Sequence, residues 1–205
     1  MKVFRSLVIA VPALAFLTFS VLGQSRIAPA GPRPGPEFWR RASCEPLDPR
    51  TKLEALENEY ATALIKAFTQ ITTVDVRGVR VDVVDLRDAG STARARGIII
   101  VLREGGDRPD DGRAFIDYEE LEKLLNGIDL VSTVNEVDSK FPGFEGRYRT
   151  FGDFEVSVFR QTARGNAARI STGVCDQVTQ TLSLDELAKV RAMLVEAKNR
   201  LDEAK

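Results

Sequence analysis

Apolar residues recur at spacings of three and four after Asp48-Pro49, a pair with the capping side chain and first-turn proline of a helix start. The recurring residues are Leu53, Leu56, Tyr60, Leu64, Phe68 and Ile71. A single apolar stripe of this kind is typical of an amphipathic helix, so the pattern predicts a helix over residues 48–73.

The pattern then changes to that of short strands. Val79 to Val83 alternates apolar and polar residues, as a half-buried strand does. Gly97 to Leu102 has no alternation, which predicts a strand that is covered on both faces. Something beyond a single helix layer must therefore pack against it. The Gly-, Asp- and Pro-rich stretch from Glu104 to Gly112 is a predicted loop, and Arg113 to Ile116 is a predicted short strand.

A second group of strands begins after residue 141. A three-residue loop, Phe151-Gly152-Asp153, pairs Tyr148 with Val156 and Arg149 with Glu155, which keeps apolar and charged faces apart. A two-residue loop sets Arg149 against Val156 and mixes the faces, so the first register is predicted. Residues 168–175 form the next predicted strand.

Two helix starts further along the chain resemble each other. Asp117 is followed three residues later by Glu120, and Ser183 by Glu186, which is the spacing of a capping box. Apolar residues fall at the same offsets after each cap, namely Leu121, Leu124 and Ile128 in the first helix and Leu187, Val190 and Leu194 in the second. Each helix follows a meander of strands, so residues 74–134 and 141–203 are interpreted as two copies of one unit.

The predicted fold class is α+β, with two tandem antiparallel β-meander–α-helix units forming one compact domain and an extra N-terminal helix. The expected division of the chain is a signal peptide (1–23), a proline-rich tether (24–47), the N-terminal helix (48–73), a first meander–helix unit (74–138) and a second one (139–205).

The helix starts Asp117-Tyr118-Glu119-Glu120-Leu121 and Ser183-Leu184-Asp185-Glu186-Leu187, with the strands before them, resemble the architecture of Whirly-type single-strand DNA-binding proteins. Each unit by itself resembles the positive cofactor 4-like coactivator fold. The chain is also similar to uncharacterised exported bacterial proteins around residues 115–125 and 144–159. The resemblance covers residues 74–203 and implies topology alone, because the lysine-rich strand motif of Whirly proteins is missing here.

The N-terminus has the pattern of a leader peptide. Lys2 and Arg5 precede an apolar run from Leu7 to Leu22, and small or compact residues before Gln24 fit a signal-peptidase site. The run is shorter than a membrane-spanning helix of about 20 residues. Cleavage is therefore predicted, with an uncleaved anchor as the alternative, and the chain is expected to be periplasmic or extracellular and free of the membrane.

The segment after the leader is rich in proline, which predicts an extended tether. It contains Trp39, the only tryptophan, which either docks on a partner or packs against the domain itself. Cys44 and Cys175 are the two cysteines, and in an oxidising compartment they allow one intramolecular disulfide. Two separate buried thiols are the alternative.

The composition excludes several classes of function. Lys and Arg number 29 against 30 for Asp and Glu, so no basic excess draws the chain to nucleic acid or anionic membranes. There is no histidine, which removes the usual Ser and Cys triads and every zinc motif that needs imidazole. No phosphate-binding loop occurs either. The sequence therefore predicts no catalytic residues, no metal site and no cofactor.

The candidate binding residues are Arg147, Tyr148, Arg149 and Arg160, together with Trp39. Aromatic rings and arginines on a sheet can hold single-stranded nucleic acid by stacking and phosphate contact. The same alternation fits a hairpin whose rings fill the core and whose arginines pair with Glu145 and Glu155. We favour the second interpretation.

Two acidic patterns point to no site. The segment Asp107–Gly112 does not fit a calcium-binding EF-hand, so a solvated turn is predicted. Asp82, Asp85 and Asp88 recur every three residues, which does not keep them on one strand face as a pair of catalytic carboxylates.

These observations favour an exported, non-enzymatic binding or interaction module. Its ligand is open, another envelope protein is one candidate partner, and nucleic acid is not expected. The alternatives are an Asp- or Glu-dependent hydrolase acting on envelope carbohydrate and a binder of single-stranded nucleic acid.

Overall fold

The computed structural model describes residues 48–73, 76, 78–103, 111–134, 143–160, 165–173 and 177–204. In this part of the chain, eight strands form two four-stranded antiparallel sheets, each with its strands in chain order. The first sheet contains β1 (Leu64–Thr72), β2 (Val79–Asp88), β3 (Arg94–Arg103) and β4 (Asp111–Asp117). The second contains β5 (Glu145–Arg149), β6 (Phe154–Arg160), β7 (Asn166–Thr172) and β8 (Val178–Leu182).

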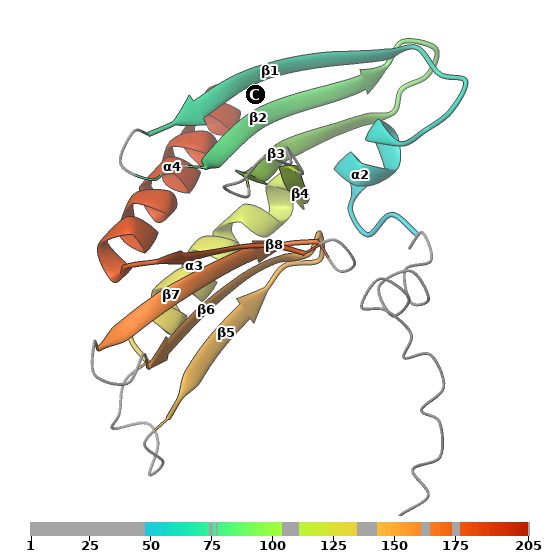
Figure 1. The fold of residues 1–205 in the computed structure, drawn as a ribbon. Helices are drawn as coiled ribbons and strands as arrows, with labels where there is room; N and C mark the ends of the chain where they lie inside the picture. The colour runs from blue at the N-terminus through green and yellow to red at the C-terminus, as the bar shows by residue number, and fades with distance from the viewer. Residues whose placement is uncertain are drawn as a thin grey trace, which may run out of the picture.

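A helix follows each sheet along the chain, and a short one precedes the first sheet. These elements are α2 (Lys52–Glu57), the 3₁₀ turn η1 (Tyr118–Glu120), α3 (Leu121–Ser132) and α4 (Leu184–Glu203). The two sheets form the outer layers, and α3 and α4 lie between them (Figure 1). The predicted α+β class with two tandem meander–helix units and an extra N-terminal helix is confirmed.

The two long helices are exchanged between the units. α3, which ends the first unit, packs mainly on β5 and β6 of the second sheet. α4, which ends the second unit, packs mainly on β2 and also contacts β1 and β3 of the first sheet. One continuous core therefore contains residues of both sheets and both helices, among them Ile100, Leu124, Val156 and Leu194. The larger of the two buried clusters is therefore shared by both units.

Strand β3 is buried on both faces, as its unbroken apolar run predicts. Ile98 and Ile100 belong to the core between the sheets. Ile99 and Val101 belong to a second cluster on the opposite face, which Leu53 and its neighbours in α2 cover. The six-residue helix α2 thus supplies the additional layer that the sequence pattern requires.

The second hairpin has the predicted register. Tyr148 lies opposite Val156 and Arg149 lies opposite Glu155. The turn between them contains Asp153 with a φ of +60°, a left-handed conformation that Asp tolerates better than most side chains do. The strand predicted over residues 168–175 is β7, which begins two residues earlier and ends at Thr172, and β8 follows it as a strand not predicted from the sequence.

The helix predicted over residues 48–73 is wrong beyond Glu57. Its start lies later as well, because Thr51 is the N-cap of α2 and its Oγ1 accepts a hydrogen bond from the Glu54 N–H. The chain turns near Ala61, whose φ is +57°, and then forms β1. The first unit therefore begins near residue 64 and not at residue 74.

The physical reason is strand pairing. The segment of β1 is rich in β-branched residues, which favour strands, and it pairs along its whole length with β2. The spacing from Leu64 to Phe68 to Ile71, which suggests a helical stripe, places Ile71 on the opposite strand face from the other two. Ile71 is buried in the core between the sheets, whereas Phe68 is mostly exposed.

Only one of the two predicted capping boxes forms. The Ser183 Oγ accepts from the Glu186 N–H, and the Glu186 carboxylate accepts from the Ser183 N–H. Asp117 makes no capping bond to the elements that follow it. Both predicted apolar stripes are nevertheless buried.

Candidate functional site

The feature of the structure best suited to binding is the free edge of β1. This strand is nine residues long, is the outermost strand of its sheet, and has exposed side chains from Ile65 to Gln70. Ile65 is 57% exposed and Phe68 is 61% exposed. The only charged side chain is Lys66, whose Nζ lies 2.8 Å from the Glu57 carboxylate of α2. An edge that is long, apolar and nearly free of charge is the kind that pairs with another strand.

Alternate residues of β1 direct their backbone groups away from the sheet. The Ala89 N–H donates to the Ala63 carbonyl over 2.9 Å, and these residues extend the register in which Leu64 lies opposite Asp88. Ala63 therefore faces β2, and every second residue after it does the same. The residues whose N–H and C=O point outward are Leu64, Lys66, Phe68, Gln70 and Thr72.

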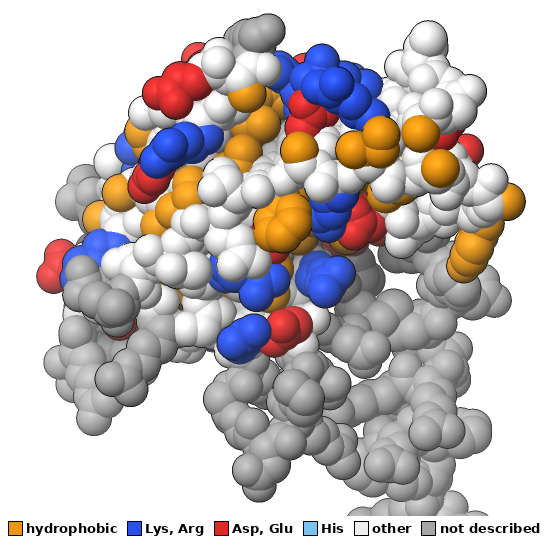
Figure 2. All heavy atoms as spheres, turned by 90° about the horizontal axis from the view of Figure 1, so that it is seen from above, with side chains coloured by type: hydrophobic (Ala, Val, Ile, Leu, Met, Phe, Trp, Pro, Cys, Tyr) orange, Lys and Arg blue, Asp and Glu red, His pale blue; other side chains and the backbone are white. Residues whose placement is uncertain are grey.

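The two large exposed side chains of β1 lie on opposite faces of the sheet. Phe68 lies on the face that α2 covers, opposite Val84, a buried residue of the second cluster. Ile65 lies on the face that buries Ile71, but at its open end. Figure 2 shows the molecule from above the view of Figure 1. On the face that it presents, hydrophobic side chains lie between groups of charged ones.

The other sheet edges within the described residues are protected. The β5–β6 turn packs against β4 so closely that a Cβ on Gly152 would lie 1.7 Å from the Phe115 carbonyl oxygen. β5 carries three charged residues in its five positions. β8 is also five residues long, and the Gln180 side chain donates to the Arg103 carbonyl of the first sheet. Short, charged or covered edges resist strand addition, so β1 differs from them in kind.

The sequence pattern did not identify this edge, because it assigned β1 to a helix. The available signal was the composition of the segment itself. Ile65, Thr69, Ile71 and Thr72 are all β-branched, and such residues favour a strand over a helix.

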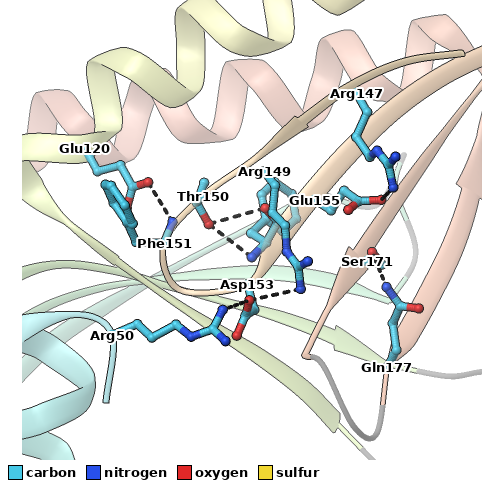
Figure 3. A network of polar contacts seen from close by, with 11 residues as sticks. Arg50, Glu120, Arg147, Arg149, Thr150, Phe151, Asp153, Glu155, Ser171 and Gln177 are labelled. Carbon is cyan, nitrogen blue, oxygen red and sulfur yellow. Dashed lines mark hydrogen bonds and ion pairs between the residues drawn. The ribbon is translucent and has the colours of Figure 1, made fainter. Parts of the chain in front are cut away.

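The sequence-predicted binding residues are only partly brought together. Arg147 and Arg149 lie on one face of β5, where Arg147 is 3.8 Å from Glu155 and Arg149 is 3.0 Å from Asp153 (Figure 3). Tyr148 lies on the opposite face. Its ring packs over Gly127 of α3, where an added Cβ would lie 2.4 Å from the ring. Tyr148 and the two arginines therefore do not form a stacking platform.

The remaining aromatic residues of this hairpin have separate surroundings. Phe154 is completely buried, whereas Phe151 is 69% exposed. The Arg169 guanidinium lies 4.7 Å from the centre of the Phe159 ring. Arg160 ends β6, and its N–H donates to the Phe144 carbonyl. The buried Phe154 ring and the Arg147–Glu155 pair agree with the interpretation of the hairpin as core and paired arginines. Phe151 is exposed and Arg149 pairs with Asp153 and not with a glutamate, which that interpretation did not predict.

The β5–β6 turn joins the N-terminal part of the domain to the second sheet. Asp153 accepts from Arg50 over 2.8 Å and from Arg149 over 3.0 Å (Figure 3). Within the turn, the Thr150 Oγ1 accepts from the Phe154 N–H over 3.0 Å.

A cleft of about 190 Å³ lies beside this turn. It is lined by Arg50, Thr51, Lys52, Asp117, Glu119, Glu120, Lys123 and Phe151. Glu120 is only 8% exposed, and its Oε1 accepts from the Phe151 N–H over 2.8 Å. Burial raises the pKa of this carboxyl, and the hydrogen bond from Phe151 only partly opposes that effect.

The other carboxylates of the cleft also hold the fold together. Asp117 accepts from the backbone N–H groups of Lys52 and Leu53 over 2.9 and 3.0 Å, so it caps α2 from a distant part of the chain. Glu119 lies 2.8 Å from the Lys52 Nζ, and this hydrogen bond lowers the pKa of Glu119. The cleft is smaller than the roughly 300–1,000 Å³ of typical ligand pockets.

The three aspartates of β2 have separate structural partners. Asp82 pairs with Arg80, and Asp88 accepts from the Thr62 hydroxyl and the Gly90 N–H. Asp85 is held by both Arg94 and Arg87, chiefly by Arg94, which lowers its pKa. In the part of the chain that the structure describes, no group of three or more His, Cys, Asp or Glu residues is placed to bind a metal ion.

Several predictions fall on residues outside the described ranges. These are the signal peptide (1–23), the tether with Trp39, the first four residues of the acidic segment Asp107–Gly112, and both members of the predicted disulfide, Cys44 and Cys175. They stay predictions. The last two residues of that acidic segment, Asp111 and Gly112, begin β4, so the solvated turn predicted there is wrong at its end. No helix of the described residues is long and apolar enough to cross a membrane.

Comparison with known proteins adds no relationship to these observations. No protein-family model matches the chain, and no curated protein matches it.

Proposed function

We propose that the protein is an exported, non-enzymatic interaction module that binds an extended polypeptide segment along the free edge of β1. The observation that carries this proposal is a nine-residue edge strand whose outward N–H and C=O groups have no neighbouring strand among the described residues. A segment added there would receive main-chain hydrogen bonds from every second residue of β1. Ile65 and Phe68 would supply apolar contacts, one on each face of the enlarged sheet.

Strand addition suits this surface better than a small ligand does. A polypeptide segment needs an edge and two shallow apolar surfaces, and these are present at β1. The cleft beside Glu120 is small, and each of its carboxylates already accepts a hydrogen bond from the protein.

The hydrolase alternative depends on that same cleft. Glu119 has a lowered pKa and Glu120 a raised one, and two carboxyls with opposite shifts are what acid–base chemistry requires. The low exposure of Glu120 favours a structural role. Hydrolysis of an envelope polysaccharide that is abolished by Glu120→Gln, in a variant that circular dichroism shows to be folded, would favour the hydrolase.

The nucleic-acid alternative depends on the arginines of β5. Arg147 and Arg149 are paired with acidic residues, which reduces the charge available to phosphate groups. A salt-sensitive affinity for single strands that falls on changing both arginines to glutamine would favour this alternative.

Export and the disulfide belong to the same proposal. We infer that the leader is removed after residue 23 and that Cys44 and Cys175 are joined, which would attach the tether to the second unit. N-terminal sequencing of the native protein tests the first statement. Thiol titration of the unreduced, denatured protein tests the second, and two free thiols would contradict it.

The test of strand addition uses the outward N–H of Gln70. Proline at this position removes one outward donor and leaves the hydrogen bonds to β2 in place, a location in which edge strands tolerate proline. Extended dodecapeptides selected from a random display library against the parent protein should bind Gln70→Pro roughly two- to tenfold more weakly, since about one main-chain hydrogen bond is lost.

The matched control is Gln70→Thr, which keeps the N–H and the strand propensity and should bind like the parent. Circular dichroism and thermal unfolding establish that both variants are folded. Equal affinity of both variants for the selected peptides, or failure to select any peptide, would argue against binding at β1.

A further inference from the structure

We propose that the segment bound by β1 is the β1 strand of a second copy of this chain, paired antiparallel about a two-fold axis at Phe68. This inference rests on the proposed function, because it names the partner of the same edge. The result would be one continuous eight-stranded sheet built from two first sheets.

The backbone of β1 is self-complementary in this arrangement. An axis at Phe68 places Leu64 opposite Thr72 of the second copy and Lys66 opposite Gln70 of the second copy. All of these residues, like Phe68 itself, belong to the set whose N–H and C=O groups point outward. In this register every outward-facing residue lies opposite an outward-facing residue of the second copy. Each such pair can exchange two hydrogen bonds, so the ladder runs along the full length of the strand.

The side chains agree with the same register. Phe68 meets Phe68 of the second copy, and aromatic pairs stabilise neighbouring strands. Ile65, which is exposed, lies opposite Ile71 of the second copy on the other face. Lys66 meets a neutral glutamine, so no like charges lie opposite each other.

A neighbouring register that also joins outward-facing residues is less favourable. Shifting the axis to Ala67 places Lys66 opposite Phe68 of the second copy and leaves Thr72 without a partner. That shift breaks the aromatic pair and shortens the ladder. Shifting the axis the other way, to Thr69, places Phe68 opposite Gln70 of the second copy and leaves Leu64 without a partner in β1. The composition of β1 therefore selects the axis at Phe68.

The other elements leave this edge accessible. α2 covers β2, β3 and β4 and reaches β1 through the Glu57–Lys66 pair, and α4 lies chiefly over β2 and also contacts β1. Both helices lie on the faces of the sheet and neither pairs with the outward backbone groups of β1. The protected edges of β4, β5 and β8 direct association to β1. Pairing of like edges is isologous, so it closes at two copies and does not extend into a filament.

The first measurement is sedimentation of the purified chain over a wide range of concentrations. A reversible dimer is expected for the parent and for Gln70→Thr. Gln70→Pro removes two hydrogen bonds from each dimer, so its dissociation constant should rise roughly tenfold or more.

The second measurement identifies the register by disulfide cross-linking under mild oxidation. In Phe68→Cys the two new cysteines lie directly opposite each other, about 5.5 Å apart between Cα atoms, which a disulfide spans. In Lys66→Cys they are displaced by four residues, about 13 Å, which it does not span. Covalent dimers should therefore form in the first variant and not in the second, with the parent protein as the background for the native cysteines.

The outcomes separate the two proposals. A chain that remains monomeric at all concentrations, yet binds selected peptides through β1, overturns the inference and leaves the proposed function in place. A dimer that persists in Gln70→Pro, or that cross-links at residue 66 and not at residue 68, also overturns the inference. A monomer that binds no peptide contradicts both.

Discussion

Two carboxylates of this protein accept hydrogen bonds from residues far away in the sequence, although their local motif predicts a helix cap. Asp117 and Glu120 have the spacing of a capping box, as Ser183 and Glu186 do. Only the second pair caps its own helix. Asp117 instead receives backbone N–H groups from α2, and Glu120 receives one from the β5–β6 turn. A carboxylate accepts from whichever N–H groups the fold places beside it, and local spacing does not determine which these are.

Removal of the Asp117 carboxylate should therefore loosen α2 and not α3. We expect Asp117→Ala to lower the free energy of unfolding by about 1–2 kcal/mol, as loss of an N-cap does. Urea denaturation measures this loss, and hydrogen exchange locates it. Exchange should become faster at the Lys52 and Leu53 amides, with α3 unchanged.

Ser183→Ala is the control, because it should accelerate exchange only in the first turn of α4. Increased exchange at the start of α3 in Asp117→Ala would mean that Asp117 caps its own helix after all.

The buried Glu120 predicts a particular dependence of stability on pH. Burial raises its pKa above the ordinary value of 4.5, so the folded protein holds this proton to higher pH than the unfolded chain does. As pH rises from about 4.5 through the folded pKa, the unfolded chain ionises first and the free energy of unfolding decreases. At neutral pH the buried charge is therefore a destabilising element.

Glu120→Gln should consequently unfold at higher urea concentration than the parent at pH 7, because the amide oxygen can still accept from the Phe151 N–H. The difference should shrink at about pH 4, where Glu120 is protonated in the parent. The lowered pKa values of Asp85 and Glu119 reduce the stability of both proteins alike in acid, so the comparison isolates Glu120. A difference independent of pH would contradict this account.

At the scale of elements, the contrast between β1 and β3 shows which patterns can be interpreted from sequence. The unbroken run from Ile98 to Leu102 permits only a fully buried element, and β3 is one. The segment that became β1 mixes apolar residues at both helical and strand spacings. Its pairing with β2, a ten-residue strand further along the chain, decided the outcome. The β-branched residues of this segment are a local signal for a strand, but its position at the edge of the sheet was beyond a local analysis of the sequence.

The short helix α2 should contribute as a layer of the core, although isolated helices of this length are not stable. Leu53 is fully buried against β3 and its neighbours. We expect Leu53→Ala to lower the free energy of unfolding by about 2–5 kcal/mol. Leu130→Ala is the matched control, since Leu130 is 70% exposed and should change stability by less than about 0.5 kcal/mol. Equal effects of the two substitutions in thermal or urea unfolding would mean that α2 is not part of the cooperative fold.

At the scale of the whole molecule, the exchange of α3 and α4 makes the two units depend on each other. A fragment ending at residue 138 would lack α4, the helix that covers β2. A fragment beginning at residue 139 would lack α3, the helix that covers β5 and β6. Each would expose an apolar sheet face. The free energy lost by leaving that face in water is large compared with the net stability of a domain of this size.

We therefore expect residues 48–138 and 139–205 to be unfolded separately and to form native-like structure when mixed. Circular dichroism and the dispersion of amide resonances measure this, and the intact chain supplies the reference. Cooperative unfolding of either fragment alone would contradict the interdependence of the units.

The sequence by itself determined the two tandem units, the buried strand β3, the register of the β5–β6 hairpin and the cap of α4. Each of these depends on neighbours in the chain or on a pattern that only one element type satisfies. The tertiary structure alone decided that residues 64–72 form a strand, that Asp117 caps α2, and that each long helix covers the sheet of the other unit. These outcomes depend on contacts between residues far apart in the chain, whose free energies outweigh the small local preferences of the segments involved.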